Sequence, residues 1–163
     1  MADPIGIDHD GYEVMTKAVS ELLNQYPGLD DRVVKFEELD TSNGIAFSAD
    51  NGALVMSEKR TIVDHIIQTC QYPFFIVYRS ASTRASQKVA IQTFLDSIGK
   101  WICKEPAVVG DEEITLESYP LLANGREIKR VTRNNSYAVE PDAKGVQDWL
   151  LPCVVEYTNE FDI

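Results

Sequence analysis

Two histidines are the residues of this chain best suited to acid–base chemistry near neutral pH. His9 lies between Asp8 and Asp10, and an imidazole with two carboxylates could hold a metal ion. The trio lacks the spaced ligand pairs that make a zinc signature specific. His65 lies in a β-prone run, where a histidine facing solvent or a subunit contact is the simpler interpretation than a catalytic base. Nucleophilic catalysis needs a base within hydrogen-bond reach of its nucleophile, and two histidines offer few such arrangements.

The carboxylates and glycines do not form a catalytic or nucleotide-binding motif either. Neighbouring carboxylates occur at Glu37 and Glu38 and at residues 111–113, but adjacent positions on a strand point to opposite faces and do not form an acid–base pair. Neither a phosphate-binding glycine loop ending in Gly-Lys-Ser/Thr nor a dinucleotide-binding glycine trio follows any expected strand. The sequence therefore predicts a protein that is not an enzyme, with no catalytic residues, cofactor or metal site.

Three cysteines, Cys70, Cys103 and Cys153, are widely spaced in apolar surroundings. An odd number at these positions fits reduced thiols in a core better than a disulfide framework.

The basic residues Arg126, Lys129, Arg130 and Arg133 form the one cluster of positive charge. Spaced along an expected hairpin, they could protect a sheet edge from unwanted pairing. They could also form an ionic docking strip for an acidic partner, including another copy of the chain. Trp149 precedes an apolar strand and could be a core residue or an interface anchor. These five residues are the candidate assembly-interface residues.

Charge and length limit the possible functions. The chain has 163 residues, of which 44% are hydrophobic, enough for the core of one domain. With 26 acidic and 15 basic residues its net charge is −11, which disfavours sequence-specific nucleic-acid binding and attraction to anionic membranes. No apolar run approaches the ~20 residues that cross a bilayer, and the first residues lack a secretory pattern. We expect synthesis in a cytosol and no membrane partner.

In the first half of the chain, residues 1–9 lack periodicity and are expected to form a flexible arm. Apolar residues recur at helical spacing over residues 11–24 until Tyr26-Pro27-Gly28 ends the pattern. A short strand is expected within residues 33–39. The turn Asp50-Asn51-Gly52 separates two further apolar runs and predicts a hairpin.

The central stretch carries the clearest hydrophobic organisation. Residues 61–69 are rich in β-branched side chains and residues 73–79 are apolar on both faces, so two strands hinged at residues 71–73 are expected. Residues 80–83 offer side-chain oxygens that could cap a following helix. A broad apolar stripe then predicts a helix over residues 85–102, which must end before Pro106.

The last third mixes loop and strand signals. Residues 106–125 are expected to be a loop with a short strand at 114–116. Residues 127–133 and 136–140 alternate around Asn134-Asn135, which predicts a second hairpin. The final strand alternates over residues 151–157, and Pro152 places it near an edge or at its own first residue. The fold class is α+β: a mixed or mainly antiparallel sheet with two helices packed on it, in one domain of residues 1–163.

Several segments carry a family resemblance: residues 71–79 (QYPFFIVYR), 87–90 (QKVA), 94–101 (FLDSIGKW), 128–130 (IKR) and 154–157 (VVEY). Across these stretches, about half the chain, the sequence resembles small minor capsid or tail-terminator proteins of siphophages and prophages of Gram-positive bacteria. The resemblance rests on an apolar strand, a helix and an Arg-bearing hairpin rather than on a diagnostic motif.

The resemblance implies a structural virion protein, made in the bacterial host cytoplasm, that forms a ring, usually hexameric. Such a ring caps the tail tube and joins it to the head connector, so the expected partners are copies of the chain, the tail tube and connector proteins. Another head–tail neck or head-completion role is the first alternative. The second is a small metal-dependent or ligand-binding cytosolic domain using carboxylates near Asp8, Asp10 and Asp64 with His9 and His65.

Overall fold

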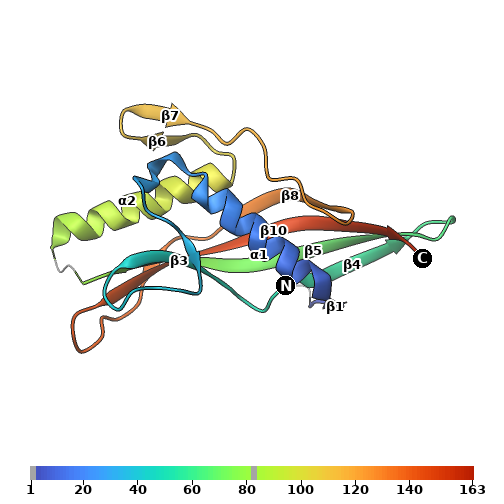
Figure 1. The fold of residues 1–163 in the computed structure, drawn as a ribbon, viewed down its shortest axis with the longest axis horizontal. Coiled ribbons are helices and arrows are strands. Elements are labelled where there is room, and N and C mark those ends of the chain that lie inside the picture. The colour runs from blue at the N-terminus through green and yellow to red at the C-terminus, as the bar shows by residue number, and fades with distance from the viewer. Residues whose placement is uncertain (1–2, 82–83) are drawn as a thin grey trace.

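The computed structural model describes residues 3–81 and 84–163, which form an α+β fold with one large sheet and two helices on the same face of it (Figure 1). The sheet has the strand order β1-β4-β5-β10-β8, with β2, β3 and β9 joined to it beside this path. All its pairings are antiparallel except that of β2 (Lys35–Phe36) with β3 (Gly44–Ala49). The predicted fold class, a mainly antiparallel sheet carrying two helices, is confirmed.

Two long central strands organise the sheet. β5 (His65–Ser80) and β10 (Gln147–Asp162) pair along their whole lengths, from His65 opposite Asp162 to Ser80 opposite Gln147. The expectation of two strands hinged at residues 71–73 is wrong, because one strand of 16 residues runs through that segment. β10 is equally not an edge strand, because it is paired on both sides.

Along the outer edge of each central strand, two shorter strands pair one after the other. β3 and β4 (Leu54–Arg60) both pair with β5, and β8 (Arg126–Arg133) and β9 (Tyr137–Ala138) both pair with β10. Both predicted hairpins, β3 with β4 and β8 with β9, are therefore wrong. At each turn signal the chain passes from one short strand to the next along the same central strand, and the two short strands do not pair with each other.

The breaks accommodate a proline in each central strand. The carbonyl of Pro73 accepts from the N–H of Asp50, so Pro73 faces the side where β3 ends and β4 begins. The carbonyl of Pro152 accepts from the N–H of Asn134, between β8 and β9. A proline cannot donate to a ladder, and here its nitrogen points to a place where the neighbouring ladder is interrupted.

Helix α1 (His9–Asn24) begins two residues before its predicted start, because the Asp8 carboxylate caps it by accepting from the N–H of Gly11 at 3.1 Å. Helix α2 (Ala85–Ile102) has its predicted bounds. Of the residues expected to cap it, Ser82 and Thr83 lie outside the described residues. Val89, expected in the buried stripe, is exposed, and the buried positions of α2 begin at Ile91.

The N-terminal segment is built into the sheet. β1 (Gly6–Ile7) pairs with β4, and the N–H groups of Ile5 and Asp8 donate to the carbonyls of Val55 and Ala53. The expectation of a flexible arm over residues 1–9 is therefore wrong for residues 5–9. A 3₁₀ turn (Pro27–Leu29) follows α1, and the expected loop after α2 contains a separate hairpin of β6 (Ala107–Val109) and β7 (Glu112–Ile114).

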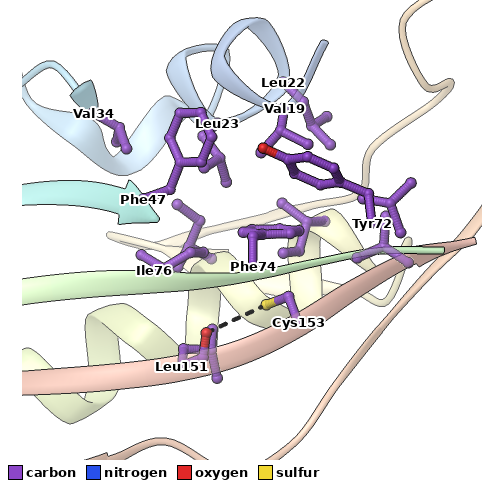
Figure 2. Packing of buried hydrophobic residues seen from close by; sticks show 14 of the residues in the cluster. Val19, Leu22, Leu23, Val34, Phe47, Tyr72, Phe74, Ile76, Leu151 and Cys153 are labelled. Carbon is purple, nitrogen blue, oxygen red and sulfur yellow. Dashed lines mark hydrogen bonds between the residues drawn. The ribbon is translucent and has the colours of Figure 1, made fainter. Parts of the chain in front are cut away.

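The core lies between the sheet and the helices. Figure 2 shows Val19, Leu22 and Leu23 of α1 packed over Tyr72, Phe74 and Ile76 of β5 and Phe47 of β3. From β10, Leu151, Cys153, Val155 and Tyr157 point to the same face, as the sequence alternation predicts. Trp149 continues this row at 2% exposure, so its place is in the core.

Candidate assembly surface

The face of the sheet opposite the helices carries an apolar band at its centre. The strand register places three cross-strand pairs there, all half-buried: Val77 with Leu150, Phe75 with Pro152, and Pro73 with Val154. Figure 1 shows α1 and α2 on the other face, and among the described elements no helix covers the band. We call Pro73, Phe75, Val77, Leu150, Pro152 and Val154 the apolar band.

The band is part of a surface large enough for a protein interface. At ~3.3 Å per residue, strands of 16 residues extend over ~50 Å, and neighbouring strands lie ~4.8 Å apart. A face of several such strands offers an area comparable with the ~800 Å² that each partner contributes to a standard interface.

Charged pairs border the apolar band at both ends. Arg79 Nε and Nη2 bind Asp148 Oδ1 and Oδ2 at 2.8 and 3.0 Å, and this hydrogen bonding raises the pKa of Arg79. Beyond the other end, Arg130 binds Glu156 in a two-point pair. An apolar centre with a polar rim is the usual organisation of protein interfaces.

A shallow hollow of about 450 Å³ adjoins the band at its Arg79 end. Its lining includes Leu39, Ala46, Val77 and Leu150, so apolar side chains from three parts of the chain meet there. The hollow is a concave site on the sheet face, large enough to take a side chain of another protein.

The four basic residues of the predicted docking strip do not share one surface, and Arg126 differs most from the others. Arg126 is buried and binds the Asp8 carboxylate through Nε at 2.9 Å and Nη2 at 2.5 Å, while the Tyr157 hydroxyl donates to Asp8 Oδ2 at 2.8 Å. Burial opposes ionisation of Asp8, but the hydrogen bonds from Arg126, Tyr157 and the Gly11 N–H outweigh it and lower its pKa. Burial and the bond to Asp8 raise the pKa of Tyr157. Arg126 thus holds the start of α1 on β8 and β10.

The other basic residues lie nearer the surface. Lys129 is exposed beside Glu127 at 3.2 Å, and Arg130 lies on the uncovered face with Glu156. Arg133 points to the helix side, 3.7 Å from Asp96 and 3.5 Å from Glu105. With Arg126 and Trp149 buried inside the subunit, an interface role stays a prediction for the more exposed Lys129 and Arg130.

The structure brings only part of the predicted histidine and carboxylate set together. Asp8, His9 and Asp10 line one hollow of about 450 Å³, but the oxygens of Asp8 are already hydrogen-bonded. His65 instead binds Asp162 at 2.8 Å and Glu160 at 3.2 Å. In the described ranges, no three His, Cys, Asp or Glu residues are arranged to hold a metal ion.

The thiols lie where the sequence places them, in apolar surroundings. Cys70 and Cys153 are buried and Cys103 is half-buried. Burial raises the pKa of the Cys70 thiol to about 11 and that of Cys103 to about 11. At neutral pH these thiols are protonated and poorly nucleophilic.

Comparison with known proteins adds no family: no protein-family model matches the chain, and no curated protein matches it significantly. No helix of the described part is long and apolar enough to cross a membrane. The sequence predicts that residues 73–79 are apolar on both faces, but it does not join them with residues 150–155 into one surface. Residues 73–77 and 150–155 are apolar at consecutive positions, which is typical of strands whose two faces are both covered by protein.

Proposed function

We propose that this protein is a structural subunit that assembles into a ring in a phage or prophage virion, in the manner of a tail terminator. The apolar band is the observation that carries the proposal. A sheet with helices on one face normally exposes polar side chains on the other. Here the central segments of β5 and β10 carry apolar side chains on both faces.

The physical argument concerns what should cover this face. Fully burying an exposed apolar side chain stabilises by ~1.5–3 kcal/mol, and a half-buried side chain gains only the share for its remaining exposed area. Six such positions in one band together favour contact with another protein layer. Copies of the chain are the partner that is present wherever the protein is made, and a repeated contact closes into a ring when its rotation permits.

The sequence resemblance supports the particular role. A terminator ring would contact the tail tube on one side and the head connector on the other, and it would need no catalytic residues. Another neck or head-completion role uses the same kind of assembly and differs in position along the tail axis. Cryo-electron microscopy of the virion distinguishes these roles by where the subunit's density lies.

The first test is the size of the purified protein in solution. We expect multi-angle light scattering to give a mass that is a multiple of the 18.3 kDa chain. Val154→Asp should shift this mass toward the monomer, because it puts a carboxylate into the apolar band. Thr69→Asp is the matched control, since Thr69 is an exposed polar residue further along the same face of β5.

A monomeric wild-type chain at high concentration would contradict the proposal. So would an unchanged mass for Val154→Asp, provided that its circular dichroism spectrum matches the wild-type spectrum. If Thr69→Asp dissociates the assembly equally, the apolar band is not the contact.

A further inference from the structure

Two bulky apolar side chains project from the tip of the β4–β5 hairpin. Ile62 is fully exposed and Val63 is 81% exposed, and they are adjacent in the turn between Arg60 and His65. Figure 1 shows this turn extending beyond the rest of the molecule at the end where the chain terminates. A solvated turn is normally polar, so a neighbouring pair of exposed β-branched residues indicates a contact.

The tip is held in one conformation by hydrogen bonds on both sides. The Thr61 N–H donates to the His65 carbonyl at 2.8 Å, and the His65 N–H donates to Thr61 Oγ1 at 3.1 Å. Arg60 binds the Asp64 carboxylate at 2.7 Å, and the Ile163 N–H donates to the Asp64 carbonyl at 3.0 Å. Because the turn is already ordered, presenting Ile62 to a partner costs little conformational entropy.

The opposite end of the molecule has a hollow of about 480 Å³. Ala81, Ala143 and Val146 supply its apolar lining. Its wall is a turn fixed by Asp142, whose Oδ1 accepts from the N–H groups of Lys144 at 2.8 Å and Val146 at 2.9 Å. Thr41, Ser42, Asp142 and Lys144 complete the lining, so the hollow combines small apolar side chains with polar ones.

The tip and the hollow lie at the two ends of the same strand. β5 starts beside the tip at His65 and ends beside the hollow at Ser80, a separation of ~50 Å for an extended strand of 16 residues. One copy cannot bring its own tip to its own hollow, but successive copies can. Such a contact joins two different surfaces and repeats head to tail.

The charges at the two ends are compatible with this contact. Glu160 and Asp162 lie beside the tip around His65, and the hollow is lined by the exposed Lys144 and by Asp142, whose Oδ1 accepts from two backbone N–H groups. An attraction between the carboxylates beside the tip of one copy and Lys144 of the next copy would orient the two copies head to tail.

We propose that the Ile62–Val63 tip of one copy docks into the Ala81–Ala143–Val146 hollow of the next copy. This inference rests on the proposed function and specifies a subunit contact of the ring. The two side chains are the anchor of the contact, since a few buried apolar residues carry most of the binding free energy of an interface.

Cysteine cross-linking tests the contact directly. In Val63→Cys mixed with Ala143→Cys, mild oxidation should give a covalent dimer, whereas each single variant alone stays uncross-linked. The double variant should give a ladder of dimer, trimer and larger species on a denaturing gel. Cross-linking of Val63→Cys with itself would show a tip-to-tip contact, and an absence of mixed dimer would also overturn the proposal.

A second measurement compares two equally exposed apolar sites. Replacing Ile62 and Val63 by Asp should raise the concentration of half-assembly about tenfold or more. Leu121→Asp is the control, because Leu121 is 99% exposed and lies between β7 and β8, outside the β4–β5 turn. Assembly with an unaltered half-assembly concentration in the tip variant would overturn this contact and leave the proposed ring in place. A wild-type chain that never assembles would contradict the proposed function itself.

Discussion

At the scale of single residues, the chain uses its ionisable groups to fasten distant segments together. Asp8 meets Arg126 across 118 positions of sequence, and His65 meets Asp162 across 97. The residue types at these positions are visible in the sequence, but their partners are not, because no local pattern specifies contacts of such separation. This is why a cluster expected to be a docking strip contains a buried structural arginine.

The Asp8–Arg126 pair should be essential for stability. Arg126→Met leaves a buried carboxylate without its cation, and we expect a loss of about 3 kcal/mol in the free energy of unfolding measured with urea. Adding Asp8→Asn should recover part of this loss, because asparagine keeps the helix cap without the charge. A double variant less stable than Arg126→Met would contradict this account.

His65 should make stability depend on pH. Hydrogen bonds to Asp162 and Glu160 raise its pKa in the folded state above the ordinary value of about 6.5. The stabilisation is therefore fully present below about pH 6.5 and is lost as the pH rises through the folded-state pKa. We expect His65→Gln to reduce the difference in melting temperature between mildly acidic and mildly alkaline buffer. An unchanged difference would assign the pH dependence to other groups.

At the scale of elements, what the sequence predicts well is local. The bounds of α2 and the buried face of β10 follow from side-chain periodicity, which needs no knowledge of other segments. The pairing of strands could not be predicted in the same way. The turn Asp50-Asn51-Gly52 is a hairpin signal, yet β3 and β4 lie in one line along β5, because the length of β5 allows both to pair with it.

The contact of α2 with the sheet depends on one small residue. A Cβ on Gly99 would lie 2.8 Å from Arg133 Cδ and 3.0 Å from Leu151 Cδ2, so a larger side chain must displace these side chains or the helix itself. We expect Gly99→Val to cost about 2 kcal/mol in thermal or urea unfolding. Ala90→Val on the exposed side of α2 is the control and should change stability much less. Helix propensity alone would make Gly99→Val slightly stabilising, so a variant as stable as the wild type or more stable would contradict the packing account.

At the scale of the whole molecule, both helices lie on one face of the sheet, and the opposite face carries the apolar band. The sequence predicts an assembling protein, with four basic residues and Trp149 as interface candidates. The structure buries Arg126 and Trp149 and places acidic partners beside Lys129, Arg130 and Arg133. The apolar band is our proposed contact, and an interface role for Lys129 and Arg130 stays a prediction beside it. Identifying it required the register of β5 against β10, which decides which half of each apolar run faces away from the helices.

The two kinds of contact predict different responses to salt. An interface centred on the apolar band should persist when ionic strength is raised from about 0.1 M to about 1 M, because screening weakens exposed charge pairs and not apolar burial. Light scattering across this range measures it. Dissociation into monomers at high salt would indicate that the contact depends on charged residues such as Lys129 and Arg130.

The prolines at the centre of the sheet have a further consequence for how the long strands find their alignment. If β5 slipped by two residues against its flanking strands, the same side chains would face the core, but Pro73 would meet a carbonyl that needs a donor. Pro152 imposes the same penalty on β10 against β8 and β9. Each proline thereby excludes the neighbouring misaligned states that side-chain alternation alone would tolerate.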